Sequence, residues 1–598
     1  MFWSLELPDR LLHERAEIET LAGEVTWIRS KRWGVDDELR IKVDVDIVIN
    51  DVTFEVELVY PHLFPDTPAF IRPRSPTTTV RWSTHQYGPG GTLCLEWGPD
   101  NWQSAITGAM LLRSAHRLLA AEAAAGATPA SVPSRHHTTL GQALRGNNCR
   151  LVVTDQLREY LNQLPSESLR SLVTHNLIHG VMDVFLVSAV NSLGGEPVVL
   201  TDVPSGVTTS FPIFAPKGIG WVFKSTRLTG SEEIGSLDTL LAVIRSAGFE
   251  GFSLPNTEGD SATRAEYVFL LQRSDNQIRA YWYCSSNDGM FRECALVGWS
   301  TSEELRIPPE HVGLSEKQIG IVGLGSVGSK VAVSLARSGV RKFVLIDDDL
   351  LLPENMCRNE LNWASVGLHK AEAVKEAISV VVPGVDVKVL LTRIGGQESA
   401  RYASTALDAL ATCDLVIDAT ANSTVFVHLA AICKRRKRIL VWGELFAGGI
   451  GGLLVRSRPG KDPDPLTMRA GVHAYLDTKE PVPFALAATT YDVEGEDTPP
   501  LIASDAEVSQ FASTVTRFAL DAALERNPSD FPDSAYLMGF KRAWIFTAPF
   551  DTQPISVAHP PAGEADLAEE QAATQQEAIE FLRQIVPQQT DAQARPAE

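Results

Sequence analysis

The chain has 598 residues, of which 44% are hydrophobic and 21% are charged. This length exceeds what a single hydrophobic core supports, so we expect roughly two to four domains. The formal net charge of −21 disfavours non-specific binding to nucleic acid or to anionic membranes, and is compatible with a basic protein partner. The N-terminus is acidic and lacks a long apolar run, so we expect neither a signal peptide nor a membrane span.

The seven cysteines are widely scattered and form no CxxC pair. In a large chain this pattern fits a reducing cytoplasm, and it predicts neither a disulfide framework nor a zinc site. Cys284 and Cys294 lie in YWYCSSNDGMFREC, which is typical of paired strands.

Helical spacing of apolar residues predicts a helix over residues 8–24, and alternation over 25–60 predicts a strand meander. A further helix is expected near 103–125, and AAAGATPASVPSRHH (123–137) has the composition of a linker. Apolar strands alternate with helices from Ile319 to about residue 457, which indicates a parallel α/β sheet.

From these patterns we predict a multidomain α/β and α+β chain with four parts. They are an N-terminal α+β domain with its linker (1–145), a middle mixed α/β domain without an interpretable motif (146–305), a Rossmann-like α/β domain (306–560) and a tail poor in large apolar residues (561–598).

The run IGIVGLGSVGSKV places Gly323, Gly325 and Gly328 between an apolar strand and a helix. In this GxGxxG arrangement the first glycine makes a tight turn, the second admits a phosphate, and the third packs the helix against the strand. The next strand, KFVLI, ends at Asp347, where an acid can bond a ribose hydroxyl. These features predict a nucleotide site and do not separate NAD from ATP.

Polar residues follow the second strand in LLLPENMCRNELNWASVGLHK, which contains Asn355, Arg358 and Lys370. A dehydrogenase needs no cations there. An enzyme that catalyses attack on the α-phosphate of ATP needs cations at this position, because negative charge builds on the phosphate oxygens as pyrophosphate leaves.

The string VLIDDDLLLPENMCRNEL…GLHK resembles the DxDxVxxxNLxRQ…GxxK signature of ubiquitin-activating and ThiF/MoeB enzymes, over roughly residues 306–457. The resemblance implies a Rossmann-like adenylation domain that uses ATP and that forms a homodimer. It implies that Asp347 contacts the ribose, that Asp349 is a second nucleotide-site acid, and that Asn355, Arg358 and Lys370 contact the phosphates.

That family commonly reads D-x-T-D-N after the next strand, and its second aspartate holds magnesium. Here the sequence is Asp418-Ala419-Thr420-Ala421-Asn422, so alanine occupies that position. We expect Mg²⁺ to be held by Asp418 or by Asp349, or mainly by phosphates and water.

Cys94 lies in HQYGPGGTLCLEWGPDNW, downstream of YPHLFPDTP. A free cysteine is most often a small buried apolar residue. The order helix, meander, YPxxxPxxP, GxxCL and Trp, with Trp102, Tyr60 and Pro61 as markers, resembles a ubiquitin-conjugating enzyme, and implies that Cys94 carries a thioester. Where that family has HPN, this chain reads His85-Gln86-Tyr87, so the asparagine that stabilises the oxyanion in that family is missing. Its role falls to His85 or to backbone amides, or is dispensable.

Enzymes that activate a carboxylate for a conjugating enzyme usually have a second cysteine, and residues 434–598 contain none. Three explanations are open: direct transfer from the adenylate to Cys94, use of a core cysteine such as Cys433, or replacement of a cysteine by alanine. For the third explanation we expect Ala548 to be the replaced cysteine, because the strand-like run WIFT meets a proline turn there.

The order of a conjugating-like and an activating-like part resembles bacterial fusion proteins of cyclic-oligonucleotide antiphage (CBASS) operons. That resemblance implies conjugation of the C-terminus of a cGAS/DncV-like nucleotidyltransferase to an unknown target amine. Two alternatives are an enzyme for a ubiquitin-like or sulfur-carrier protein, and a NAD-dependent oxidoreductase or non-catalytic scaffold.

Overall fold

The structure is a computed structural model. It describes residues 2–75, 82–83, 85–87, 90–123, 144, 146–179, 182–191, 196–202, 217–255, 265–285, 289–299, 307–382, 384–397, 399–481, 502–558, 575–576 and 578–579. Most of the predicted linker and nearly all of the predicted tail lie outside these residues. The chain divides into two compact units, Met1–Gly146 and Asn147–Glu598.

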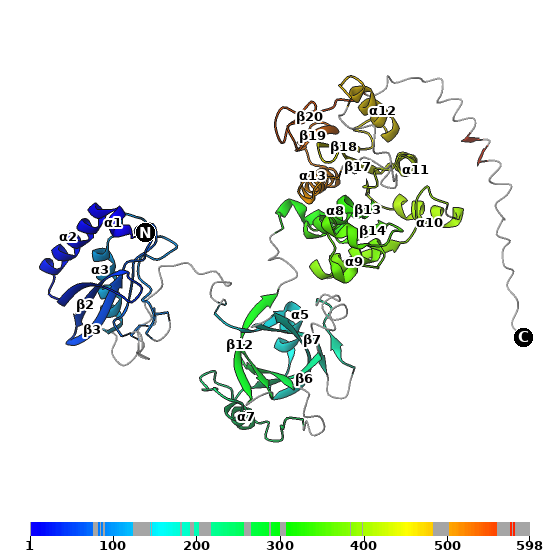
Figure 1. Ribbon diagram of the computed structural model, residues 1–598. Helices are drawn as coiled ribbons and strands as arrows, with labels where there is room; N and C mark the ends of the chain where they lie inside the picture. Colours follow the sequence, from blue (N-terminus) through cyan, green and yellow to red (C-terminus); the bar gives the residue numbers. More distant parts are fainter. Residues whose placement is uncertain are drawn as a thin grey trace, which may run out of the picture. The chain divides into compact units, whose positions relative to one another are not determined.

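The N-terminal unit is an antiparallel meander, in the order β1-β2-β3-β4, covered by helices (Figure 1). Every second residue of β2 is buried, which is why the alternating sequence forms a half-buried strand. The predicted helix over 8–24 is confirmed as α2. The elements are α1 (Trp3–Glu6), α2 (Pro8–Glu24), β1 (Ile28–Val35), β2 (Ile41–Ile49), β3 (Val52–Val59), β4 (Phe70–Pro73) and α3 (Gly108–Ala123).

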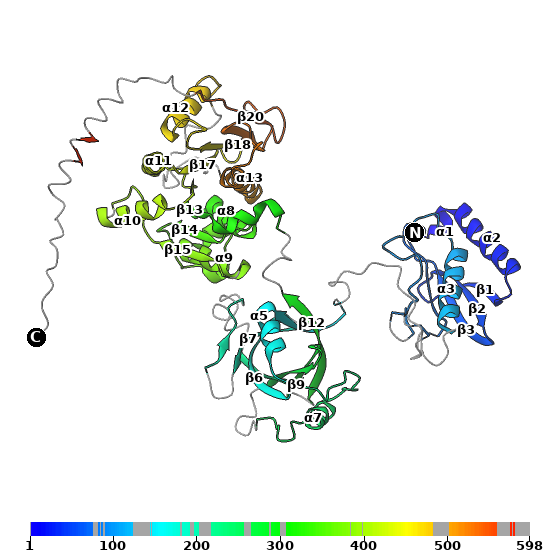
Figure 2. The same cartoon turned by 180° about the vertical axis from the view of Figure 1, so that it is seen from behind.

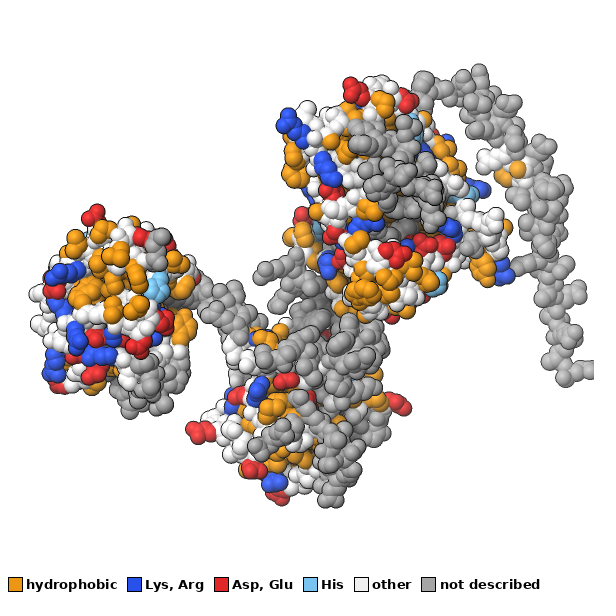
Figure 3. Space-filling model, viewed as in Figure 1, with side chains coloured by type: hydrophobic (Ala, Val, Ile, Leu, Met, Phe, Trp, Pro, Cys, Tyr) orange, Lys and Arg blue, Asp and Glu red, His pale blue; other side chains and the backbone are white. Residues whose placement is uncertain are grey.

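Apolar side chains gather on the face of this unit seen in Figure 3. The large apolar residues that the unit exposes include Leu5, Leu12 and Leu63, which are 79%, 61% and 69% exposed. Exposed apolar surface of this kind is typical of regions that contact other proteins.

The middle region is a closed barrel. Strands follow the order β5-β12-β11-β10-β9-β6-β7-β8, and β5 also pairs with β7, so the sheet closes on itself (Figure 2). Helices are present as expected, and strands dominate. The elements are β5 (Cys149–Thr154), α5 (Asp155–Gln163), β6 (Ser168–His179), β7 (Met182–Asn191), β8 (Val198–Val199), β9 (Lys217–Ser225), α7 (Leu237–Ser246), β10 (Glu266–Arg273), β11 (Ile278–Cys284) and β12 (Met290–Trp299).

The C-terminal region is a sheet with helices on both faces, in the order β15-β14-β13-β16-β17-β18-β19-β20. One apolar core contains residues of α8, α9 and α13, and the other contains residues of α10, α11 and α12. The elements of the first part are η1 (Pro309–Glu316), β13 (Gln318–Val322), α8 (Ser326–Arg337), β14 (Lys342–Ile346), η2 (Pro353–Cys357), η3 (Trp363–Ser365), α9 (Lys370–Val381), β15 (Asp386–Leu390), α10 (Ala400–Ala411) and β16 (Leu415–Asp418). The remainder are α11 (Ser423–Arg436), β17 (Ile439–Phe446), β18 (Gly451–Ser457), α12 (Pro465–Leu476), α13 (Asp505–Ala523), β19 (Ala535–Gly539) and β20 (Thr552–Pro554).

The expectation of a parallel sheet from Ile319 to about residue 457 is wrong beyond β17. Strands β13 to β17 are parallel, whereas β17 and β18 pair antiparallel. A tight connection with three successive positive φ angles, at Ala447, Gly448 and Gly449, joins them. Such a short connection can only reverse the chain, because a parallel crossover needs many more residues. Among the described residues, no helix is long and apolar enough to cross a membrane.

The glycine loop between β13 and α8 offers a test of the local packing. A Cβ on Gly328 would collide with the carbonyl oxygen of Gly323, whereas one on Gly325 would meet no atom within 4 Å. We expect Gly328→Ala to destabilise the chain by about 1–3 kcal/mol, because overpacking outweighs the helical preference of alanine. Gly325→Ala should leave the melting temperature nearly unchanged. Thermal unfolding of both variants checks this, and equal melting temperatures would contradict it.

Candidate functional site

Three strand ends lie side by side at the centre of the C-terminal sheet. Val322 of β13 is in register with Ile346 of β14 on one side and with Asp418 of β16 on the other. The glycine loop and the chain from Asp347 onward therefore start at the same edge as the Asp418 side chain. The carboxyl edge of a parallel sheet is where open α/β folds bind ligands.

The glycine loop has the backbone that close approach to a ligand requires. Gly323 has a φ of +84°, a conformation that residues with a Cβ rarely adopt. A Cβ there would lie 2.8 Å from Cγ2 of Thr420, so the loop contacts the segment after β16. Gly325 caps α8, and a Cβ built on it meets no atom of the described residues within 4 Å, which leaves room for a phosphate at the helix N-terminus.

Asp347 joins the glycine loop to the chain that follows β14. Its Oδ2 accepts a hydrogen bond from the Leu324 amide at 2.6 Å, and its Oδ1 accepts one from the Asp349 amide at 2.9 Å. Burial raises the pKa of the Asp347 carboxyl, and the two amide hydrogen bonds oppose that rise. The carboxylate fixes the loop backbone beside the position predicted for the ribose.

Asp349 and Lys370 are brought together as an ion pair, with Nζ and Oδ2 3.0 Å apart. The Lys370 amide also donates to the Asp349 carbonyl at 2.9 Å. Lys370 is 9% exposed, whereas the Asp349 side chain is 56% exposed. The pair places the buried ammonium at the start of α9.

Asn355 and Arg358 lie in and just after the short η2 helix. The Asn355 Oδ1 accepts the Leu352 amide at 3.0 Å, so that oxygen shapes the turn. Arg358 Nη1 makes a long contact of 3.5 Å with the Ala503 carbonyl, ahead of α13. Arg358 Nε is buried and has no hydrogen-bond partner within the described part of the chain, so the guanidinium has a donor available there.

Asn359 is a site residue that the sequence analysis missed. Its side chain is 8% exposed, and Nδ2 donates to the Leu324 carbonyl of the glycine loop at 3.4 Å. Its position directly after Arg358 is the signal that could have identified it.

Asp418 is 4% exposed at the end of β16. Its Oδ1 accepts hydrogen bonds from the Thr420 amide at 3.0 Å and from the Thr420 hydroxyl at 2.6 Å. Burial raises the pKa of this carboxyl, while Thr420 and the charge of Arg469 oppose the rise. Ala421 has a φ of +51°, so the chain turns sharply at the position where an aspartate was expected.

A second group of carboxylates follows β14. Oxygen atoms of Asp347, Asp348 and Asp349 lie within 4.8 Å of one another, a spacing that a metal ion can bridge. Both positions expected for magnesium, at Asp418 and at Asp349, therefore lie at the same sheet edge.

Cys94 lies in the other unit, between the buried Leu93 and Leu95, and is half-buried. Its amide donates to the His85 carbonyl at 2.7 Å, and Gln86 bridges to Leu93. The segment that replaces HPN therefore runs beside the thiol. The Tyr87 hydroxyl lies 3.9 Å from Sγ, and the sequence analysis did not single out Tyr87 for this role.

The seven cysteines differ sharply in exposure. Cys357 is exposed and Cys94 is half-buried, whereas Cys149, Cys284, Cys294, Cys413 and Cys433 are buried. Burial raises the pKa of Cys433 to about 12, which disfavours the thiolate that acyl transfer requires. Cys357 ends the η2 helix next to Arg358, so a thiol borders the predicted phosphate site.

The expected strand before Ala548 is wrong. Residues 544–545 and 549–550 are turns and residues 547–548 are a bend, with positive φ angles at Trp544 and Phe550. The amide and hydroxyl of Thr547 donate to Asp551, and β20 begins only at Thr552. These side-chain hydrogen bonds favour a turn over a strand. Ala548 is exposed in this turn.

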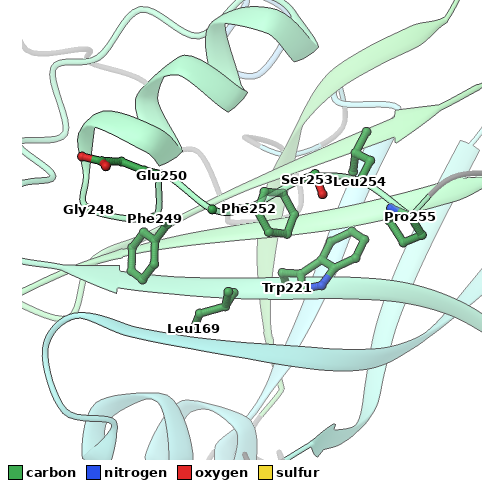
Figure 4. Close-up of a pocket in the computed structure, with 10 residues that line it drawn as sticks. Leu169, Trp221, Gly248, Phe249, Glu250, Phe252, Ser253, Leu254 and Pro255 are labelled. Carbon is green, nitrogen blue, oxygen red and sulfur yellow. The ribbon is translucent and has the colours of Figure 1, made fainter.

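A separate pocket of about 680 Å³ lies in the barrel region, between strands β6 and β9 and the chain after α7 (Figure 4). Trp221, Phe249 and Phe252 give it an aromatic lining, and Glu250 stands at one end. It contains none of the predicted site residues.

Comparison with known proteins agrees with the C-terminal fold. Residues 307–475 match the model of the ThiF family. The chain is 36% identical over 137 residues to the uncharacterized protein y4qC of Sinorhizobium fredii, covering 22% of this chain and 24% of that protein. It is 30% identical over 207 residues to the ATP-dependent ubiquitin transferase-like protein Cap2 of Enterobacter hormaechei. That match covers 32% of this chain and 34% of Cap2.

Among solved structures, that of Escherichia coli MccB with ATP aligns with a TM-score of 0.32 and 15% identity, covering 42% of this chain and 67% of MccB. The matches to the two curated relatives thus span about a third or less of each relative's length. Residues 307–475 form a ThiF-family domain, in a chain related in sequence to the bacterial proteins named Cap2.

Proposed function

We propose that this chain is an ATP-dependent protein ligase that adenylates the C-terminal carboxylate of a partner protein and transfers it through Cys94. The carboxylate attacks the α-phosphate of ATP, and the bond to the β-phosphate breaks to release pyrophosphate. The Cys94 thiolate then attacks the acyl carbonyl of the adenylate and AMP leaves. Finally an amine of the target attacks the thioester, which forms an amide and restores the thiol.

The observation that carries the adenylation step is the buried Nε of Arg358, which has no hydrogen-bond partner among the described residues. Arg358 directly precedes Asn359, whose side chain contacts the glycine loop. A buried guanidinium donor without an acceptor is costly, and a phosphate oxygen would satisfy it. The open space at Gly325 and the ammonium of Lys370 supply room and further positive charge. A NAD-dependent dehydrogenase, the competing class, has no use for these cations.

Asp418 is the residue we assign to Mg²⁺, which accompanies ATP and neutralises its phosphate charge. Its carboxylate is buried beside the glycine loop, and its Oδ1 is oriented by Thr420. A single fixed carboxylate fits an ion that keeps phosphate and water as its other ligands. The exposed Asp349 is the alternative ligand.

We propose the C-terminus of a cGAS/DncV-like nucleotidyltransferase as the partner, with an unknown target amine and a homodimeric ThiF-family domain, in antiphage defence. The relative Cap2 is named an ATP-dependent ubiquitin transferase-like protein, which supports the transferase class. A ubiquitin-like or sulfur-carrier protein is the other partner class, and the C-terminal tail that stimulates pyrophosphate exchange distinguishes them.

Arg358→Ala should reduce ATP–pyrophosphate exchange by about 100-fold or more, because it removes a donor that stabilises charge on the α-phosphate. Exchange is measured with the nucleotidyltransferase present. Arg401→Ala, which changes an exposed arginine on α10, is the matched control and should exchange normally. Unchanged exchange in Arg358→Ala would refute its assignment.

Cys94→Ala should abolish the thiol-sensitive adduct with the partner and leave pyrophosphate exchange intact, since the adenylate forms without a thiol. Cys357→Ala should retain both activities if transfer to Cys94 is direct. Non-reducing gels with and without dithiothreitol, together with the exchange assay, measure this. Loss of the adduct with normal exchange in Cys357→Ala would instead make Cys357 the intermediate thiol.

Ala548→Cys tests whether a cysteine at this exposed turn accepts the acyl group first. In a chain that also carries Cys94→Ser, we expect a partner adduct that dithiothreitol cleaves. Ala474→Cys, at an exposed alanine of α12, is the control and should form none. Failure of the Ala548→Cys variant to form an adduct would exclude this position and leave direct transfer to Cys94 or transfer through Cys357.

A further inference from the structure

Two buried cysteines meet inside the barrel, far from the predicted adenylation site in sequence. Cys149 begins β5, and Cys294 lies on β12, with Sγ atoms 2.8 Å apart. They are 2% and 4% exposed. Both belong to the apolar core that also contains Trp282.

Strand register brings the two thiols together. Arg150 of β5 is paired with Ala295 of β12 in a parallel ladder, and Cys149 and Cys294 immediately precede this pair. Adjacent positions on neighbouring strands have the backbone spacing that a disulfide needs. Cys284 is also buried and belongs to the same core, but its strand β11 pairs with β10 and β12 and not with β5.

The contact lies at the barrel seam, by which we mean the ladder between the first barrel strand, β5, and the last, β12. Strand β5 is the first strand of the middle region and β12 is the last, and their pairing joins the two ends of its sequence. The ladder between β5 and β12 is therefore the longest-range strand pairing in the barrel. A covalent bond at this position would close the loop that contains every other barrel strand.

We propose that Cys149 and Cys294 are a redox-modifiable pair that forms a disulfide across the barrel seam. Oxidised glutathione is a sufficient oxidant. One protein thiolate attacks its disulfide and releases one glutathione, and the second protein thiolate then attacks the mixed disulfide and releases the other. The two protein sulfurs lose two electrons, and the two protons go to the released thiols.

Burial controls how this chemistry proceeds. The hydrogen bond with Cys149 and burial both raise the pKa of Cys294, so the pair reacts slowly while the seam is closed. In a reducing compartment the pair is held as two thiols. Under oxidising conditions, opening of the seam exposes the thiols, and reclosing brings the sulfurs into contact.

The full chain with Cys94→Ser and Cys357→Ser, which removes the two accessible thiols, is incubated in glutathione buffers of increasing oxidised fraction. Incubation runs to constant composition at the highest temperature at which the chain stays folded. The samples are then quenched with acid, denatured and alkylated. Peptide mapping shows whether each cysteine is a free thiol or part of a disulfide. We expect a peptide pair linked through Cys149 and Cys294 that dithiothreitol separates.

Additional Cys149→Ser or Cys294→Ser substitutions should abolish the link, and Cys284→Ser should retain it. The linked chain should also unfold at a temperature higher by about 5 °C or more, because the closed loop restricts the unfolded state. Alkylation of both thiols at every glutathione ratio would overturn the proposal, as would linkage of either to Cys284.

Discussion

The Asp347 carboxylate is the interaction on which the candidate nucleotide site depends. Its two oxygens accept amides from the glycine loop and from Asp349, so one side chain ties the turn after β13 to the turn after β14. Asp349 in turn pairs with Lys370 at the start of α9. Loop, crossover and helix are thereby fixed relative to the sheet edge before any ligand binds. Groups that are fixed in place before the reaction avoid reorganisation during it.

Much of this site could be predicted because its determinants are local in sequence. The order strand, GxGxxG and helix requires a glycine with positive φ at Gly323 and a close helix contact at Gly328, and the structure has both. The helix over 8–24 was likewise predictable, because apolar spacing within one segment decides it. The antiparallel part of the C-terminal sheet was not predicted, because the run of alternating strands and helices was extended across residues 447–449. The Gly448-Gly449 pair between two apolar runs is the turn signal that could have marked the reversal.

Specific side-chain contacts, one long-range and two local, account for the features that the sequence analysis missed. Asn359 reaches the Leu324 carbonyl only because the chain after β14 folds back over the glycine loop. Tyr87 approaches Cys94 through the bridge between Gln86 and Leu93, and no spacing rule identifies such a contact. The Ala548 turn depends on hydrogen bonds to Asp551 that compete with a strand. In each case a side chain far along the chain or a local polar bond decides the geometry.

Cysteine exposure limits which thiols can serve the proposed chemistry. Acyl transfer needs a thiolate that solvent and a partner can reach, and burial disfavours the charged form. Five of the seven cysteines are buried, which restricts group transfer to Cys94 and Cys357. Burial removes Cys149 and Cys294 from acyl transfer, and the register of β5 with β12 places their sulfurs in contact at the barrel seam. One property, solvent access, therefore divides the thiols between two chemistries: group transfer at the surface and oxidation in the core.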